Sequence, residues 1–177
     1  MSFLVRKITR GKWSVGEHIE AVNADAITQC MKTQDNTLSV WKINEEKDIQ
    51  NSILAMAAAN EFLSKIDVVI LSEQALLDRE IPISTTPGIT PCKDLIDTHR
   101  DLSDLNIKHL ALISDLIAAK IRNEEVHSFS LGALKNILCS AIDAGKLTTE
   151  SLSESVKAKV VKHATHLKDS GIKLDGV

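Results

Sequence analysis

Residues 37–43 read TLSVWKI, and this short stretch decides the fold class. In an extended chain, Leu38 and Val40 fall on one face. Trp41 and Ile43 fall on the other face, so both faces of the segment are apolar. A strand with two apolar faces needs cover on both sides, which places it in the interior of a sheet. The stretch therefore predicts an α/β protein with a central strand at this position.

Two further segments have the length and composition of strands. FLVRKI at 3–8 and DVVILS at 67–72 are short and rich in β-branched residues. Between the second and third strands, apolar residues recur at helical spacing over 45–64. Strands joined through a helix of about twenty residues are expected to pair in parallel. We therefore expect a small sheet of about three strands in the N-terminal half.

The segment 81–91, IPISTTPGITP, separates two parts of different character. It contains all three prolines of the chain together with four hydroxyl residues. We interpret 1–80 as a small α/β unit, 81–91 as a Pro/Thr-rich connector and 92–177 as a helical region. We expect the helical region to pack on the α/β unit, so that the chain forms one compact domain.

After the connector, the apolar spacing predicts amphipathic helices throughout the C-terminal half. One apolar stripe runs from Leu95 to Ile121, and it fits either one long helix or two. A further helix is expected to begin after Ser130 and to end at Gly145. A last one opens at SLSE, where Ser151 and Glu154 have the spacing of a capping box. These patterns predict a helix-rich α/β fold.

Residues 99–106, HRDLSDLN, match the catalytic-loop pattern of protein kinases at every fixed position. Phosphoryl transfer also needs a glycine-rich loop, a paired strand lysine and a D-F-G aspartate. The sequence has no glycine-rich loop of the required spacing and no D-F-G, and it is too short for two lobes. Leu102 and Leu105 of HRDLSDLN also continue a helical pattern of apolar residues, whereas the catalytic segment of a kinase is a loop. We therefore reject a protein kinase and assign no catalytic residue.

The densest polar cluster of the C-terminal half is formed by Asp97, His99, Arg100 and Asp101. Either acid could orient His99 as a base. Ion pairs on a helix surface explain the same letters more simply. We therefore predict that the cluster is an outward interaction surface.

Four basic residues near the start of the chain form a second polar set: Arg6, Lys7, Arg10 and Lys12. They could contact an anion or nucleic acid, but a charged edge strand that limits aggregation is the simpler interpretation. The net charge of −3 argues against a nucleic-acid partner. The hydroxyls of Thr85 and Thr86 could also face an anion, but a turn is the simpler interpretation.

No pattern in the sequence indicates a metal or a cofactor. Cys30, Cys92 and Cys139 are odd in number and far apart, so we expect reduced core residues. No apolar run is long enough to span a membrane. We therefore expect a cytoplasmic protein without metal, cofactor or membrane contact.

These observations favour a non-catalytic protein-interaction module of accessory, antitoxin or immunity type. The charge balance suggests a partner protein with a basic surface. The alternative is a small α/β enzyme, a hydrolase or nucleotide-processing protein, with its site at strand ends and the 81–91 loop.

Overall fold

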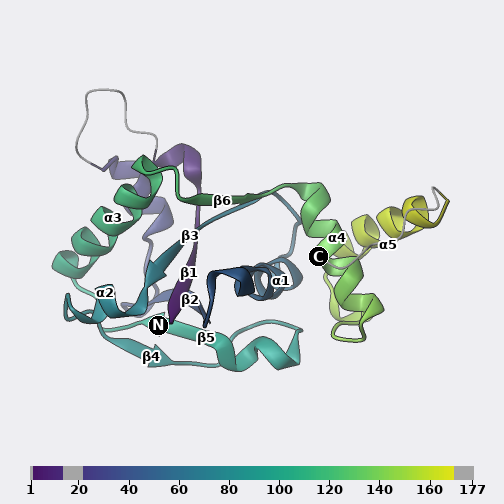
Figure 1. Cartoon of the computed structure of the whole chain (residues 1–177), viewed down its shortest axis with the longest axis horizontal. Coiled ribbons are helices and arrows are strands. Elements are labelled where there is room, and N and C mark those ends of the chain that lie inside the picture. Colours follow the sequence, from purple (N-terminus) through teal and green to yellow (C-terminus); the bar gives the residue numbers. More distant parts are fainter. Residues whose placement is uncertain (1, 14–21, 170–177) are drawn as a thin grey trace.

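One antiparallel sheet runs through the molecule, with helices on both of its faces (Figure 1). The computed structural model describes residues 2–13 and 22–169, and within these ranges the sheet has six strands in the order β4-β5-β2-β1-β3-β6. The strands are β1 (Phe3–Ile8), β2 (Leu38–Ile43), β3 (Ile66–Ser72), β4 (Ile83–Thr85), β5 (His99–Leu102) and β6 (Val126–Phe129).

The three strands predicted for the N-terminal half are confirmed as β1, β2 and β3. Their predicted parallel pairing is wrong, because β1 pairs antiparallel with both β2 and β3. β2 and β3 do run in the same direction, as a helical crossover requires. However, β1 lies between them, so the two strands never become neighbours.

The prediction of a three-stranded sheet confined to the N-terminal half is also wrong. β4 lies inside the expected connector, and β5 and β6 lie in the half that was expected to be helical throughout. The two outermost strands, β4 and β6, have three and four residues. Strands this short show too few alternations for a period of two to be recognised.

Helical segments of different lengths connect the strands. The α-helices are α1 (Ile49–Ala59), α2 (Glu73–Leu77), α3 (Ile107–Arg122), α4 (Leu131–Asp143) and α5 (Glu154–Asp169). Shorter turns are η1 (Arg10–Lys12), the π-helical η2 (Ala26–Cys30), η3 (Glu46–Asp48), η4 (Lys93–Thr98) and η5 (Thr149–Ser151). The stripe predicted from Leu95 to Ile121 is therefore divided into η4, β5 and α3.

Capping residues explain where the C-terminal helices begin and end. The Ser130 side chain accepts a hydrogen bond from the Ala133 amide, so α4 begins as predicted. Gly145 follows this helix with φ of 70°, a left-handed conformation that favours glycine. The cap of α5 is different from the prediction, because Ser153 rather than Ser151 accepts from the Val156 amide.

The two faces of the sheet are covered by separate apolar cores. One core lies between the sheet and α1, α4 and α5, and the other between the sheet and η2, α2 and α3 (Figure 1). β2 contributes Trp41 and Ile43 to the first core and Leu38 and Val40 to the second. The interior position predicted for TLSVWKI is therefore confirmed, with β1 and β5 on either side.

Candidate functional site

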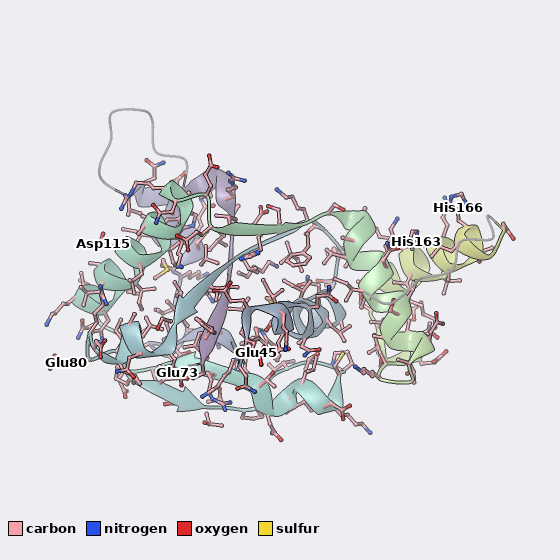
Figure 2. All side chains as sticks on the ribbon, in the orientation of Figure 1. Glu45, Glu73, Glu80, Asp115, His163 and His166 are labelled. Carbon is pink, nitrogen blue, oxygen red and sulfur yellow. The ribbon has the colours of Figure 1, made fainter. Side chains whose placement is uncertain are left out.

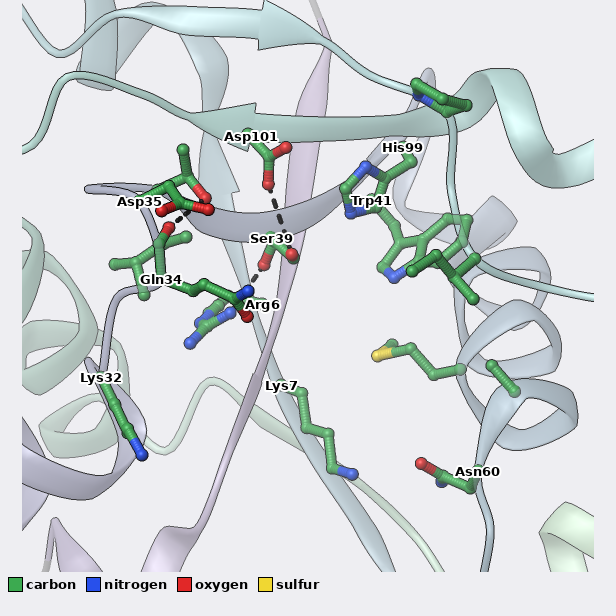
Figure 3. A pocket seen from close by; sticks show the side chains of 16 residues that line it. Arg6, Lys7, Lys32, Gln34, Asp35, Ser39, Trp41, Asn60, His99 and Asp101 are labelled. Carbon is green, nitrogen blue, oxygen red and sulfur yellow. Dashed lines mark hydrogen bonds between the residues drawn. The ribbon is translucent and has the colours of Figure 1, made fainter.

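A cavity opens where β1 and β2 separate. The two strands pair only from Phe3 opposite Ile43 to Val5 opposite Trp41. Beyond this point, β1 continues along β3 and β2 continues along β5. The space between the diverging strands is a cavity of about 530 Å3, which we call the β1–β2 cavity (Figure 3). Its lining includes Arg6, Lys7, Lys32, Asp35, Ser39, Trp41, Asn60, Ile89, His99 and Asp101.

Arg6 crosses the gap between the two strands. Its Nη1 donates to the carbonyl of Ser39 at 2.7 Å, and its Nη2 donates to the carbonyl of Cys30 at 2.6 Å. Burial lowers the pKa of Arg6, although a guanidinium keeps its charge in proteins. Its Nε is buried and has no hydrogen-bond partner among the described residues. Arg6 therefore stabilises the split in the sheet and still offers one donor.

Three more side chains that line the cavity have donor groups without a partner among the described residues. The side chains of Lys7 and Lys32 are exposed, and neither takes part in an ion pair within the described residues. Partial burial and the neighbouring charge of Arg6 lower the pKa of Lys7. Asn60, just after α1, has a buried Nδ2 with no partner in the described part of the chain. Lys7 and Asn60 point into the open space from opposite walls (Figure 3).

On the β5 wall, hydrogen bonds connect three polar side chains. Thr86 Oγ1 lies 2.8 Å from Asp101 Oδ2 and 2.9 Å from His99 Nδ1. The Asp101 carboxylate only accepts, so it receives the single hydroxyl proton of Thr86. The Thr86 oxygen must then accept from His99 Nδ1–H, which in a neutral imidazole leaves His99 Nε2 as an acceptor. Ser39 Oγ donates to the second oxygen of Asp101 at 3.3 Å.

The ring of His99 is fixed by packing as well as by Thr86. It meets the Trp41 indole edge to face, with ring centroids 5.1 Å apart and an interplanar angle of 76°. The Gly88 backbone packs against both residues from the 81–91 segment. His99 is only 9% exposed, so its orientation is set before any ligand arrives.

The polar cluster predicted as one helical face is divided by the strand geometry. His99 and Asp101 alternate with Arg100 along β5 and line the cavity, whereas Arg100 belongs to the other face. Arg100 Nη1 donates to the carbonyls of Asp97 and His99. Asp97 lies in η4 and does not line the cavity. The helical interpretation of the cluster is therefore wrong.

The four basic residues near the start of the chain are divided too. Arg6 and Lys7 line the β1–β2 cavity, while Lys12 pairs with Asp25 at 3.6 Å and Arg10 is exposed in η1. β1 lies in the middle of the sheet, so the interpretation as a charged edge strand is wrong. Of the threonine pair, Thr86 reaches the site and Thr85 ends β4.

Other residues of the site gave little signal in the sequence. Lys32 and Asn60 follow helical segments and have no distinctive neighbours. Their place in the lining of the same cavity as Arg6 depends on the path of the chain around β1 and β2. The hydroxyl of Thr86 next to Pro87 was the one signal that could have extended the predicted site.

The described residues contain no group of three His, Cys, Asp or Glu side chains that could hold a metal ion. His163 and His166 lie together on α5, far from Glu73 and Glu80 (Figure 2). His163 Nε2 is 2.6 Å from Asn136 Oδ1, and burial together with the charges of Lys135 and His166 lowers the pKa of His163. Cys30, Cys92 and Cys139 are all buried and free.

Within the described ranges, no helix combines the length and the apolar character needed to cross a bilayer. Comparison with protein-family models, curated proteins and solved structures gives no match to this chain.

Proposed function

We propose that the chain is a non-catalytic protein-interaction module and that the β1–β2 cavity receives an acidic side chain of its partner. One observation carries this proposal: the unsatisfied groups at the cavity are mainly hydrogen-bond donors. Arg6 and Asn60, which line the cavity, have the donors Nε and Nδ2 without a partner among the described residues, and the ammonium groups of Lys7 and Lys32 form no ion pair within the same ranges. A buried donor without a partner costs about 1–3 kcal/mol, so a ligand that supplies acceptors is favoured.

The local charge supports an acidic ligand. Three cationic side chains, Arg6, Lys7 and Lys32, line the cavity together with two acids, Asp35 and Asp101. The cavity therefore carries an excess of positive charge on a chain whose net charge is −3. The expectation of a basic partner rests on the acidic charge balance of the chain and on the polar cluster around His99, whereas the groups at this cavity favour an acidic surface on the partner.

The two tryptophans allow a direct binding test. Trp41 lines the cavity, and Trp13 is buried in the core on the other face of the sheet. We expect succinate and an acetylated, amidated pentaglutamate to shift the indole NMR signal of Trp41 but not that of Trp13. The double variant Lys7→Gln/Lys32→Gln should lose this shift. Lys108→Gln/Lys162→Gln, which removes two exposed lysines elsewhere, should retain it.

The same variants test whether the ligand belongs to a protein. We expect affinity purification of the native chain to recover one stoichiometric protein. The Lys108→Gln/Lys162→Gln control should recover it too, while Lys7→Gln/Lys32→Gln should not. If both double variants recover the partner equally, the cavity is not the binding site for that partner. Recovery of no stoichiometric protein with any variant would contradict the module itself.

A second candidate function is a small hydrolase or nucleotide-processing enzyme that uses the same cavity. The hydrogen-bonded chain from Asp101 through Thr86 to His99 favours it, because His99 Nε2 is left as a proton acceptor. Pro87 and Ile89 of the 81–91 segment also line the cavity. A rigid histidine beside several donors would suit an anionic substrate.

Turnover assays separate the two candidates. An enzyme of this kind should hydrolyse one of a panel of p-nitrophenyl esters, p-nitrophenyl phosphates or nucleoside triphosphates, and His99→Gln should abolish that turnover. If His99→Gln leaves the turnover unchanged, His99 is not the base. If the native chain turns over none of these compounds and still binds pentaglutamate, the interaction module is favoured.

A further inference from the structure

The β1–β2 cavity borders a second hollow of about 560 Å3. The two share Ala59, Asn60 and Ile89 in their linings. Beyond these shared residues, the second hollow is bordered by Thr90, Pro91 and Ser153, among others. These shared residues place the two spaces side by side, with Asn60 and Ile89 at the junction, and we call the two together the trough.

Ile89 stands at this junction on a fixed backbone. Its side chain is 92% exposed, the highest value among the large apolar residues of the described chain. The residues on both sides of it are anchored: the Gly88 amide donates to the Ile96 carbonyl at 2.9 Å, and Thr90 Oγ1 donates to the Ala55 carbonyl at 3.1 Å. An apolar side chain on an ordered backbone loses little backbone entropy when a ligand binds, so Ile89 is preorganised for contact.

The opposite wall is also held in place. Ser153 Oγ lies within hydrogen-bond distance of the carbonyls of Asn60 and Glu61, at 3.2 and 2.8 Å. This contact ties the start of α5 to the loop after α1. Phe62, the next residue of that loop, is 64% exposed. The trough therefore has two fixed walls. Ile89 is exposed on one wall, and Phe62 is exposed next to the other.

We infer that the trough binds an extended segment of the partner, with an acidic side chain in the β1–β2 cavity and an apolar side chain against Ile89. This inference rests on the function proposed above and adds the form of the ligand. The donors in the β1–β2 cavity are complementary to an acidic side chain, and Ile89 at the junction is complementary to an apolar one. A compact anion would fill only the first hollow and would leave Ile89 exposed.

The test uses the full chain and a phage-displayed library of random heptapeptides. We expect selection to enrich peptides that combine an acidic residue with an apolar residue at a fixed spacing. A synthetic peptide of the selected sequence should bind roughly tenfold more weakly to Ile89→Ser than to the native chain. Ile107→Ser, which removes a side chain that is 86% exposed on α3, should bind as tightly as the native chain. Replacing the acidic residue of the peptide by its amide should also abolish tight binding.

Several results would overturn the inference while leaving the proposed function intact. Selected peptides could carry acidic residues without an apolar companion, or Ile89→Ser could bind as tightly as Ile107→Ser. Succinate could bind as tightly as the selected peptide, which would show that the rest of the segment adds no affinity. Sedimentation could show self-association that Ile89→Ser abolishes, which would identify a second copy of the chain as the occupant. If neither succinate nor pentaglutamate shifts the Trp41 signal, the proposed function and the inference fail together.

Discussion

Gly88 lies so close to Trp41 that a Cβ atom at position 88 would be 2.6 Å from Trp41 Cη2. The same atom would be 2.9 Å from the Cβ of His99. Both neighbours are buried and neither is the flexible end of a side chain. We therefore expect Gly88→Ala to destabilise the fold by about 1–3 kcal/mol, as overpacking does. Urea unfolding measures this difference.

Gly132 provides the matched control for this substitution. A Cβ atom there would have its nearest neighbour, Ser130 Oγ, at 3.8 Å, which is an ordinary contact. Gly132 lies inside α4, so Gly132→Ala should leave the stability unchanged or raise it by up to about 1 kcal/mol. If Gly88→Ala unfolds at the same urea concentration as the native protein, the close contact with Trp41 is not a constraint on the fold.

Arg6→Met tests the bridge across the split in the sheet. The substitution removes the donors to the carbonyls of Ser39 and Cys30. It also removes the cost of burying the charge, which is the cause of the lowered pKa of Arg6. We expect a net loss of about 2 kcal/mol in the free energy of unfolding, because two charge-assisted hydrogen bonds outweigh that cost.

Arg79 is the comparison for Arg6, because its Nη1 also donates to a backbone carbonyl, that of Ala75, but at the exposed surface. Arg79→Met should change the stability by less than about 0.5 kcal/mol. Equal effects of the two substitutions in thermal unfolding would show that Arg6 has no special role at the cavity.

Thr86→Val breaks the link between Asp101 and His99. His99 Nδ1 loses its partner and Asp101 keeps only the hydrogen bond from Ser39, so we expect a loss of about 1–3 kcal/mol in stability. A sharper readout is the tautomer of neutral His99, which 15N chemical shifts report. In the native protein we expect the proton on Nδ1, and in Thr86→Val the preference for Nδ1 should be lost. Thr165→Val, at an exposed position on α5, should leave the His99 tautomer unchanged. A native His99 with its proton on Nε2 would contradict the hydrogen-bond directions given above.

Glu73→Gln tests the contact of Glu73 with Lys42 and Ser2, on the face of the sheet that α2 and α3 cover. Burial alone would raise the pKa of Glu73, but hydrogen bonds from Ser2 and Lys42 lower it overall. The Lys42 Nζ is 2.9 Å from Glu73 Oε2. Because the folded-state pKa is below the unfolded-state value, the carboxylate stabilises the fold above the unfolded pKa, and this contribution is lost as the pH falls through the folded pKa.

We therefore expect Glu73→Gln to cost about 1–2 kcal/mol at pH 7, and less as the pH falls below about 4.5. Glu80→Gln, at the exposed residue labelled in Figure 2, should cost less than about 0.5 kcal/mol at either pH. Urea unfolding across this pH range provides the comparison. A cost for Glu73→Gln that grows as the pH falls would have the opposite sign and would exclude this account.

The sequence was informative where an element was long or had two apolar faces. The TLSVWKI segment has apolar residues on both faces, and the structure places it inside the sheet as β2. Ser130 and Gly145 mark the two ends of α4, because caps act through local backbone chemistry. Such signals depend on a few neighbouring residues and need no knowledge of the rest of the fold.

The sequence was misleading where pairing with a distant strand decided the local structure. In HRDLSDLN, the leucines continue a helical spacing, yet His99–Leu102 pairs with both β2 and β4 as strand β5. Asn106, the last letter of that string, caps α3 by accepting from the His109 amide at 3.0 Å. Long-range hydrogen bonds therefore overrode the local periodicity.

The candidate site was only partly predictable for the same reason. His99 and Asp101 belonged to the predicted polar cluster, and Arg6 and Lys7 belonged to the predicted basic set. Nothing in the sequence joined the two groups, which are more than ninety positions apart. They meet because β2 lies between β1 and β5, and that strand order follows from the packing of the whole sheet.

The order of the strands in the sheet is compatible with folding during synthesis on the ribosome. β1 is synthesised first and lies near the centre, and β2 and β3 add to its two edges. The β4–β5 pair then extends the sheet beyond β2, and β6 extends it beyond β3. β5 can dock on β2, β4 on β5 and β6 on β3, so no strand has to be threaded between two strands that are already paired. The sheet can therefore grow outward from its first strand during translation.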